Sequence, residues 1–379
     1  MARIGIDLTA LPTLKGGVAF YLIELVRALQ RVDCDNVYWL IARDVHEAEL
    51  QPVAANFSLF TVALASRPAR LLWEQTRLPQ LAADLRLDVL HSPHYTRPLV
   101  RLPCASVVGV MDLTFFVLPR HHTAVKRWFF RTMLPVSVRR ADRVIAISDS
   151  TKKDLERWLD VAPGRVDVTP LAVSAAYSPN VPANVVAQVR HRYELPDAYI
   201  LYVGRLEPRK NLPRLLESYR QLVSRMPSAP PLVLAGARGW HRHELDITLG
   251  RLQPRVMTLG YVPEPDLPAV YAGALLFVYP SLYEGFGIPV LEALSCGVPT
   301  ITSKVSSMAE VAGDAAELVD PASTADILKA MERLLADTGR RAELRARGLE
   351  RAKSFSWDST ARLTRESYLR AIHDSRQVA

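Results

Sequence analysis

The chain has 379 residues, of which 49% are apolar, 23% charged and 8% aromatic, so it can bury a large core and should fold as about two domains. This composition excludes disordered and fibrous proteins, and no apolar run approaches the ~20 residues that span a bilayer. The 47 basic and 39 acidic side chains leave a net charge of +8, and the three widely spaced cysteines argue against a disulfide framework or a zinc site.

Strands and helices alternate from the first residues onward. Residues 3–8 are typical of a buried strand, residues 17–29 of an amphipathic helix and residues 37–42 of the next strand. This βαβ rhythm continues through strands predicted at residues 59–64, 89–91, 105–110 and 144–148, with helices at 73–85, 124–140 and 150–159. Because no long apolar leader precedes the first strand, we expect a cytoplasmic protein.

A second series of strands follows a break in the pattern. The periodicity fails after residue 169, and the segment Ser178-Pro-Asn-Val-Pro182 is typical of a linker. Strands are then predicted at residues 199–204, 231–236, 256–260, 275–279, 299–302 and 317–319. The predicted domains cover residues 1–178 and 198–355, with a linker over 179–197 and a final helix over 356–379.

This alternation predicts an α/β fold. Strands that alternate with helices form parallel sheets covered on both faces, so we expect two Rossmann-like doubly wound domains facing each other across a cleft. Ligands of such sheets bind at the carboxyl ends of the strands. The Arg-rich stretch over residues 333–353 is interleaved with glutamates, which is typical of an exposed helix face.

The most informative segment starts at the end of a buried strand and reads PSLYEGFGIPVLEAL. Its proline-bearing end is typical of the first turn of a helix. The backbone amides of Gly285, Phe286, Gly287 and Ile288 would then surround a helix start, which suits a phosphate or another anion. Two glutamates, Glu284 in the loop and Glu292 eight positions later, can accept hydrogen bonds from different hydroxyls of one ligand.

Two other interpretations of this loop stay open. It can be a plain tight turn in which Glu292 only favours the positive end of the helix. It can also be a dinucleotide-binding loop, but Val290 stands where the third glycine of that fingerprint belongs, which argues against a nicotinamide cofactor.

A second constellation reads VGRLEPRKNL and follows the first strand of the second series. Arg205 and Lys210 flank the start of a helix here, after Gly204, and two fixed cations beside a helix start suit a diphosphate. An ordinary surface charge cluster is the alternative. Near the amino terminus, Gly16 and Gly17 begin the first helix, where the lack of side chains lets a ligand approach the backbone.

These motifs together resemble the family-four glycosyltransferases. The resemblance covers nearly the whole chain, including the segments WEQTRLP from Trp73 and HSP from His91, which are similar to a mannosyltransferase-like branch active in bacterial polysaccharide and lipopolysaccharide assembly. It implies a GT-B fold and a retaining hexosyltransferase that needs no metal or other cofactor. In that fold residues 1–178 would bind the acceptor, residues 198–355 would bind the nucleotide sugar, and the helix over residues 356–379 would pack on the first domain. The donor it implies is a nucleotide sugar, GDP-mannose or a related GDP-deoxyhexose first and a UDP-sugar second.

The resemblance also implies roles for individual residues. Arg205 and Lys210 would neutralise the departing diphosphate, and Glu284 would hold the donor sugar. Glu292 would bind the ribose hydroxyls. The remaining donor contacts would come from main-chain groups at Gly16, Gly17, Gly204, Val262, Gly285, Phe286, Gly287 and Ile288.

One position departs from the family pattern. The family commonly has His-Asp-Leu after the fifth strand, and this chain has Met111-Asp112-Leu113. A thioether cannot replace an imidazole as a hydrogen-bond donor, so Asp112 is the candidate for a sugar-facing role. His91 and His94 follow a neighbouring strand and are further candidates. Because of Met111, a protein that binds a sugar nucleotide without turning it over stays as an alternative.

The acceptor is expected to be a saccharide or a lipid-linked saccharide. Residues 120–143 hold seven basic side chains and one acid, interleaved with aromatics, so this segment can rest on an anionic membrane surface. Aromatics that fill the core are the alternative. A nucleic-acid partner is not expected, because the basic residues belong to no recognised nucleic-acid-binding module.

Overall fold

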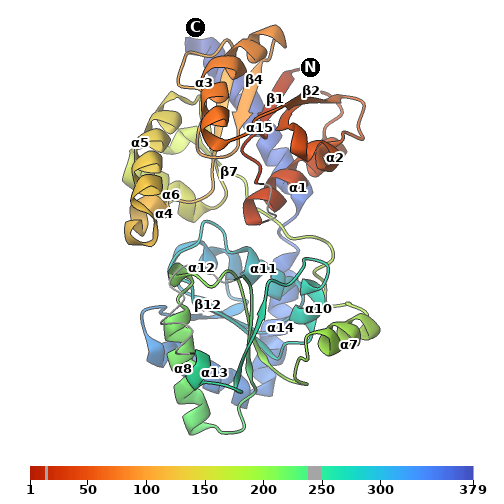
Figure 1. The fold of residues 1–379 in the computed structure, drawn as a ribbon, viewed down its shortest axis with the longest axis vertical. Helices are drawn as coiled ribbons and strands as arrows, with labels where there is room; N and C mark the ends of the chain where they lie inside the picture. Colours follow the sequence, from red (N-terminus) through yellow and green to blue (C-terminus); the bar gives the residue numbers. More distant parts are fainter. Residues whose placement is uncertain (13–15, 238–248, 379) are drawn as a thin grey trace. The chain divides into compact units, whose positions relative to one another are not determined.

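The computed structural model describes residues 1–12, 16–237 and 249–378, which form two compact units. Unit 1 comprises residues 1–171 and 356–379, and unit 2 comprises residues 172–355 (Figure 1). Both units contain a parallel sheet with helices around it, so the two predicted doubly wound domains are present. No helix in the described ranges combines the length and the apolar character needed to cross a membrane.

The sheet of unit 1 has seven parallel strands. In chain order they are β1 (Arg3–Asp7), β2 (Val37–Arg43), β3 (Phe57–Val62), β4 (Val89–Ser92), β5 (Ala105–Val110), β6 (Arg143–Ala146) and β7 (Val166–Val168). Their spatial order is β3-β2-β1-β4-β5-β6-β7. The order reverses between β1 and β4, and in such sheets ligands bind outside the carboxyl ends of the strands at this switch point.

Helices cover both faces of this sheet. They are α1 (Gly17–Val32), α2 (Glu47–Leu50), α3 (Arg67–Asp84), α4 (Thr114–Val117), α5 (Ala124–Arg140), α6 (Asp149–Leu159) and α15 (Trp357–Val378), with short 3-10 turns η1 (Asp44–His46), η2 (Pro119–His121) and η3 (Pro163–Arg165). The sequence caps several of them. The Ser148 hydroxyl accepts from the Thr151 amide at 3.0 Å to begin α6, as N-cap serines do.

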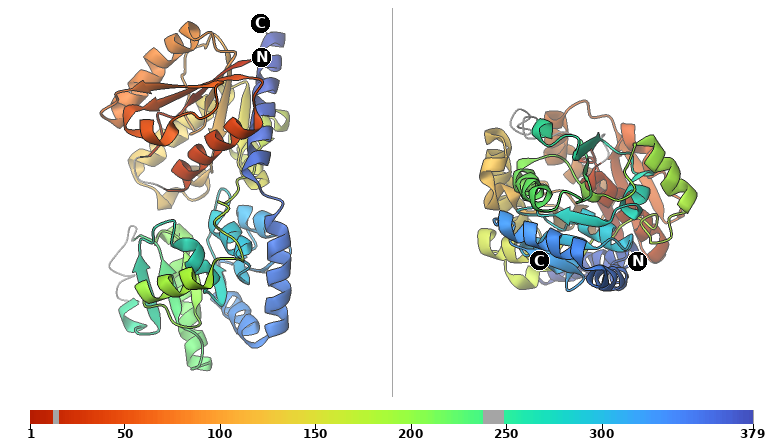
Figure 2. Two further views of the ribbon diagram at one scale, coloured as in Figure 1. Left: turned by 90° about the vertical axis from the view of Figure 1, so that its right-hand side faces the viewer. Right: turned by 90° about the horizontal axis from the view of Figure 1, so that it is seen from below.

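The last helix, α15, lies along unit 1 rather than with the residues that precede it (Figure 2). It packs against α1 and strands β4 to β7. Its Tyr368 hydroxyl lies 2.7 Å from His91 Nδ1, and both side chains are buried. His91 therefore holds the C-terminal helix on the sheet and is not the replacement for an active-site imidazole that the sequence suggested.

Unit 2 has six parallel strands. They are β8 (Ile200–Val203), β9 (Leu232–Ala235), β10 (Val256–Gly260), β11 (Leu276–Tyr279), β12 (Thr300–Ser303) and β13 (Ala316–Val319), in the spatial order β10-β9-β8-β11-β12-β13. The described helical segments are α7 (Ala183–Arg192), η4 (Pro208–Lys210), α8 (Leu212–Arg225), α10 (Leu267–Ala272), α11 (Ile288–Ser295), α12 (Ser306–Ala312), α13 (Thr324–Ala336) and α14 (Thr338–Ala352). The switch point lies between β8 and β11.

The structure differs from the predicted domain limits at one point. The units divide after residue 171, not 178, and residues 179–197, expected to be a linker, include α7. This helix packs against α10, and its last residue, Arg192, forms a 2.7 Å ion pair with Asp266. The prolines and small residues before α7 mark the start of a helix rather than an interdomain hinge.

Candidate active site

Two loops meet at the switch point of the unit 2 sheet. One follows β8 and runs from Gly204 to Asn211, and the other follows β11 and ends at Gly287. The Asn211 side-chain amide donates to the Pro280 carbonyl at 2.9 Å, and the Leu282 amide donates to the Arg209 carbonyl at 2.9 Å. These bonds fix the two loops to each other, so residues 75 positions apart in the chain form one cluster.

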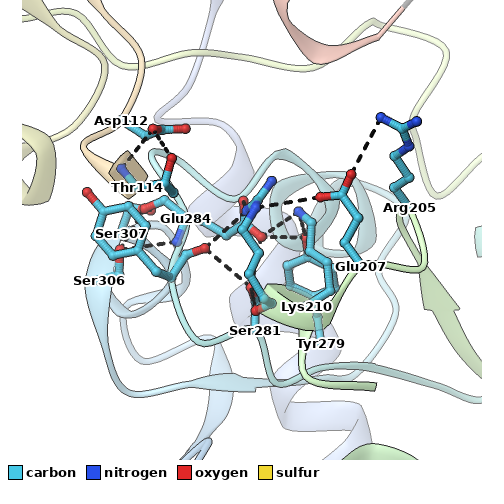
Figure 3. Close-up of polar contacts among 12 residues, drawn as sticks. Asp112, Thr114, Arg205, Glu207, Lys210, Tyr279, Ser281, Glu284, Ser306 and Ser307 are labelled. Atoms are coloured by element: carbon cyan, nitrogen blue, oxygen red, sulfur yellow. Dashed lines mark hydrogen bonds and ion pairs between the residues drawn. The ribbon is translucent and has the colours of Figure 1, made fainter. Parts of the chain in front are cut away.

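The centre of the cluster is the buried carboxylate of Glu284 (Figure 3). Its Oε1 accepts from Lys210 Nζ at 2.5 Å, from the Tyr279 hydroxyl at 2.8 Å and from the Ser281 hydroxyl at 2.9 Å. Its Oε2 accepts from Arg209 Nη1 at 2.8 Å. Every partner comes from one of the two loops or from the end of β11, so the local fold determines the geometry.

The main chain of Glu284 is fixed as firmly as its side chain. The hydroxyls of Ser306 and Ser307, at the start of α12, donate to the Glu284 carbonyl at 2.6 and 2.8 Å. The Ser306 residue has a φ of 58°, a left-handed conformation that a serine adopts only under local constraint. The loop that carries Glu284 is therefore supported from the next helix as well.

Electrostatics keep this carboxyl charged. Burial alone would raise the pKa of Glu284, but the charges of Arg209 and Lys210 outweigh burial and hold the pKa at about 2. Burial lowers the pKa of Lys210, and the Glu284 carboxylate opposes that change. The cluster is thus a buried ion pair at neutral pH, with two cations around one carboxylate.

The structure separates the two predicted cations. Lys210 lies in the cluster, whereas the Arg205 side chain is 60% exposed and has Glu207 as its acidic neighbour, with Nη1 to Oε1 at 3.5 Å (Figure 3). Arg209 occupies the place beside Glu284 instead. Nothing in the sequence pattern favours Arg209 over Arg205, because both lie in the same loop and only the 3-10 turn over residues 208–210 decides which side chain turns inward.

The glycine-bearing loop forms the predicted helix start. Gly287 has a φ of 98° and begins α11, so a side chain at this position would be strained. The Phe286 ring is buried and packs edge-on against Phe355 at 5.7 Å. The amides of Phe286, Gly287 and Ile288 have no hydrogen-bond acceptor in the described part of the chain. Together with the buried Gly285, these three residues form the turn of backbone that leads into α11.

Glu292 lies in the middle of α11 and is half-buried. The Tyr271 hydroxyl donates to it at 2.7 Å, and the Tyr177 hydroxyl is a second donor. The two rings pack edge to face with centroids 5.9 Å apart. Burial raises the pKa of Glu292 to about 7, and the tyrosine hydrogen bonds only partly oppose the rise. The two predicted carboxylates therefore have opposite electrostatic environments.

The other predicted donor contacts of unit 2 lie at strand ends. Gly204 follows β8 with a φ of 151°, and a side chain there would meet the Tyr202 and Tyr279 rings. Val262 follows β10 and is buried, whereas its neighbour Tyr261 is 65% exposed. The Gly260 carbonyl already accepts from the Gly236 amide at 2.7 Å, so that carbonyl helps to join the ends of β9 and β10.

The unit 1 candidates also follow strands. Gly16 is the N-cap of α1 and Gly17 its first residue, and a side chain added at either position would meet no other group of the residues that the structure describes. The Asp112 carboxylate accepts from the Thr114 amide and hydroxyl at 3.0 and 2.7 Å, just before the short helix α4 (Figure 3). Met111 beside it is buried. Within the described ranges, no group of three His, Cys, Asp or Glu residues could hold a metal ion.

Comparison with known proteins assigns both halves of the chain. Residues 188–353 match the family described as glycosyl transferases group 1, and residues 15–177 match glycosyltransferase family 4. The O-antigen chain mannosyltransferase B of Escherichia coli is 34% identical over 376 residues, which cover 93% of this chain and 95% of that protein.

Solved structures share the fold. HepE of Anabaena in complex with UDP-glucose has a TM-score of 0.75 at 18% identity and covers 97% of this chain and 99% of its own. WaaG, a glycosyltransferase involved in lipopolysaccharide biosynthesis, has a TM-score of 0.73 at 14% identity, with coverage of 97% and 99%. The similarity to both therefore extends over two doubly wound sheets, as predicted.

Proposed function

The chain belongs to the group 1 and family 4 glycosyltransferases and is a hexosyltransferase, and we propose that it transfers mannose or a related deoxyhexose, with retention, from a nucleotide sugar. The acceptor is a saccharide or lipid-linked saccharide in polysaccharide or lipopolysaccharide assembly. A GDP-linked donor is the first candidate because the similar E. coli protein is a mannosyltransferase. A UDP-linked donor is the second, since HepE holds UDP-glucose.

The observation that carries this proposal is the cluster at the switch point of unit 2. Lys210 and Arg209 pair with Glu284, which precedes by two residues a run of three backbone amides that have no acceptor in the described chain; two cations and a helix start in one loop suit a diphosphate. Glu284 holds both cations in place and offers its carboxylate to hydroxyls of the donor sugar. Glu292 would accept from the ribose hydroxyls in place of its tyrosine donors.

The reaction needs charge stabilisation more than acid–base chemistry. The bond between the anomeric carbon and the diphosphate oxygen breaks, and the acceptor oxygen bonds to that carbon on the same face. The acceptor proton passes to the departing phosphate oxygen. Lys210, Arg209, the exposed Arg205 and the amides of the α11 start would stabilise the negative charge that develops on the leaving group, each well-placed donor by a few kcal/mol.

Substitution of the cluster tests the proposal. We expect Lys210→Ala and Glu284→Ala to lower the transfer rate by about 100-fold or more. Each also leaves a buried charge with fewer partners, so stability should fall by about 3 kcal/mol. The double variant K210M/E284Q removes one charge of each sign and leaves Arg209 with Glu207 as its acidic neighbour, so it should recover part of the stability but not transfer. Lys304→Ala, which breaks an exposed ion pair in the same unit, is the control, and full transfer by K210M/E284Q would contradict the assignment.

The donor base and the non-catalytic alternative need a separate measurement. A ligand that binds only the folded state raises the melting temperature, so GDP, UDP, ADP and dTDP should be compared at equal concentration. We expect the largest rise with GDP. Release of GDP from GDP-mannose in the presence of a mannose-terminated acceptor distinguishes an enzyme from a binding protein, because a non-catalytic partner would be stabilised by GDP without turnover.

We propose a peripheral membrane contact through one face of α5. Val125 and Trp128 are 78% and 70% exposed, and Lys126, Arg131 and Arg139 are exposed near them. The Phe130 ring, by contrast, stacks on the Phe115 ring with centroids 4.2 Å apart. Some aromatic side chains of this segment therefore pack inside unit 1, whereas Trp128 faces solvent. A basic helix with an exposed tryptophan suits an anionic lipid surface, at about 1 kcal/mol per basic residue.

Flotation with anionic vesicles at low salt measures this contact. The variant W128A/R131E should reduce the vesicle-bound fraction about tenfold, and Trp158→Ala should not. Trp158 is the matched control because it is also exposed, on α6, and is stacked by Arg157. Equal binding of all three proteins, or none by the unmodified chain, would refute the contact.

A further inference from the structure

The Glu284 cluster lies in unit 2, whereas a second polar cluster lies in unit 1; its His94 also interacts electrostatically with Asp112. It occupies the carboxyl ends of β1 and β4, at the switch point of that sheet, beside α3 (Figure 1). Its members are Asp7, Arg70, Glu74 and His94. Glu74 belongs to the segment WEQTRLP, and His94 follows the segment HSP. Neither segment has a role in the donor site described above.

Glu74 organises the cluster from α3. It is fully buried, and its Oε2 accepts from Arg70 Nη1 at 2.7 Å and from the Thr96 hydroxyl at 2.9 Å. Its Oε1 accepts from the Gln75 side-chain amide at 2.9 Å. Gln75 in turn accepts from the Leu99 amide at 2.7 Å. The Glu74–Gln75 pair thus ties α3 to the segment after β4, and it neutralises Arg70 within the cluster.

Asp7 is the group in this cluster whose hydrogen bonds are incomplete. The residue is 3% exposed, and its Oδ1 accepts from the amide and hydroxyl of Thr9 at 3.0 and 2.6 Å. No residue in the described part of the chain donates to its Oδ2. Burial raises the pKa of Asp7, and the charge of Arg70 opposes the rise. This oxygen keeps some contact with solvent, since it is not one of the fully enclosed polar atoms without a partner, and a ligand hydroxyl can donate to it.

His94 supplies a second kind of group. It is half-buried, and burial, together with the charge of Arg70, lowers its pKa to about 4. The imidazole is therefore neutral at physiological pH and can both donate and accept a hydrogen bond. The turn that carries it is fixed, because the Tyr95 amide donates to the Gly109 carbonyl of β5 at 2.9 Å and the Thr96 amide donates to the His94 carbonyl at 2.7 Å.

The chemistry of these groups selects the ligand. An acidic oxygen and a neutral imidazole suit hydroxyls, which are donors and acceptors at once, and they do not suit a phosphate, because the Arg70 cation is already paired with Glu74. We infer that Asp7 and His94 contact hydroxyls of the saccharide acceptor and that Glu74 positions them through Arg70 and Thr96. This inference rests on the proposed glycosyl transfer and names the acceptor-contacting residues of unit 1.

Saturation-transfer NMR with methyl α-mannoside as the probe tests the site without turnover. Asp7→Asn keeps an acceptor for Thr9 and has nearly the same volume, and His94→Gln keeps one donor and one acceptor. We expect each to lower the affinity for the probe about tenfold or more, as the loss of a hydrogen bond to a charged or well-placed group does. With a mannose-terminated lipid-linked acceptor, we expect the KM for acceptor to rise by a similar factor.

A matched control separates binding from folding. Asp33 is also a buried carboxyl of unit 1, 2% exposed, but it precedes β2 and its oxygens accept from Asn36 and Tyr38 at 2.8 and 2.6 Å. Asp33→Asn should leave the affinity for the probe unchanged even if it lowers the melting temperature. Unchanged affinity in D7N and H94Q, or no binding of the probe by the unmodified protein, would overturn the inference. The dissociation constant for GDP, measured in parallel, reports on unit 2 and judges the proposed function separately.

Discussion

Two carboxylates in unit 2 show how the environment of single residues divides their tasks. Glu284 has two cations beside it and a pKa of about 2, so it is a fixed negative charge. Glu292 has only tyrosine hydroxyls and a pKa raised to about 7 by burial. With this pKa, Glu292 is about half protonated near neutral pH. A ligand that donates hydrogen bonds to it stabilises the charged form of the carboxyl and so lowers its pKa. The two glutamates are thus suited to different parts of one donor.

The raised pKa of Glu292 predicts a pH-dependent stability. Between pH 4.5, its ordinary pKa, and about 7, the folded protein holds a proton that the unfolded chain has released. The contribution of this proton to the free energy of unfolding is therefore fully present at low pH and is lost as the pH rises through 7. Glu292→Gln cannot titrate and keeps an oxygen that accepts from Tyr271. We compare the free energy of unfolding of E292Q with that of the unmodified protein. We expect this difference to favour E292Q by on the order of 2 kcal/mol more at pH 8 than at pH 4.5. We also expect E292Q to bind the nucleotide more weakly.

Denaturant unfolding of both proteins at pH 4.5 and pH 8 measures this difference. Glu217→Gln is the control, because Arg220 lowers the pKa of Glu217 to about 2 and the same substitution there should show no gain with rising pH. A constant difference between E292Q and the unmodified protein across this range would show that Glu292 has an ordinary pKa.

At the scale of secondary-structure elements, the sequence predicts most of what positions the site. The buried strands and the helix start at Gly287 were predicted because apolar runs, glycines and prolines act locally. The inward turn of Arg209 and the helix over residues 183–192 were not, because they depend on contacts with residues far away in the chain. The Arg-rich helix α14 is a mixed case: Glu350 and Lys353 at its end form an exposed pair as expected, but Arg345 donates to the buried loop at Gly297 at 2.8 Å.

Glycines at two helix starts should respond differently to substitution. Gly287→Ala places a side chain at a φ of 98°, with Met308 at contact distance, and should lower stability by about 1–2 kcal/mol. Gly17→Ala lies in α1, where no described residue approaches the added carbon, and alanine favours a helix by up to ~1 kcal/mol. We expect G17A to be as stable as the unmodified protein or more so, and to bind GDP-mannose more weakly.

Melting temperatures and the dissociation constant for GDP-mannose measure both effects. Gly164→Ala, where an added carbon also meets no other group, serves as the control for both quantities. Unchanged donor binding in G17A would remove Gly17 from the donor site, and an undiminished melting temperature in G287A would show that the loop can relax without its glycine.

At the scale of the whole molecule, the order of the chain and the order of the units differ. The chain leaves unit 1 at residue 171, completes unit 2 at residue 355 and returns to unit 1 with α15. Unit 2 is therefore continuous in sequence, whereas unit 1 is assembled from two segments. Tyr368 and Ala371 of α15 have no exposed surface, and Trp357 packs against Phe20 at 5.7 Å, so residues 1–171 alone would expose the apolar surface that α15 covers.

This connectivity predicts unequal behaviour of the two units when they are separated. A fragment of residues 172–355 contains the Glu284 cluster and Glu292 with all the partners described above, so it should fold and bind GDP, about tenfold more weakly than the full chain because the contacts expected from Gly16 and Gly17 are missing. A fragment of residues 1–171 should aggregate unless a peptide of residues 356–379 is added, because an uncovered apolar face favours association. Circular dichroism melting of each fragment and GDP titration of the first measure both outcomes. Cooperative folding of residues 1–171 without the peptide would show that α15 is an addition to unit 1 and not a part of its core.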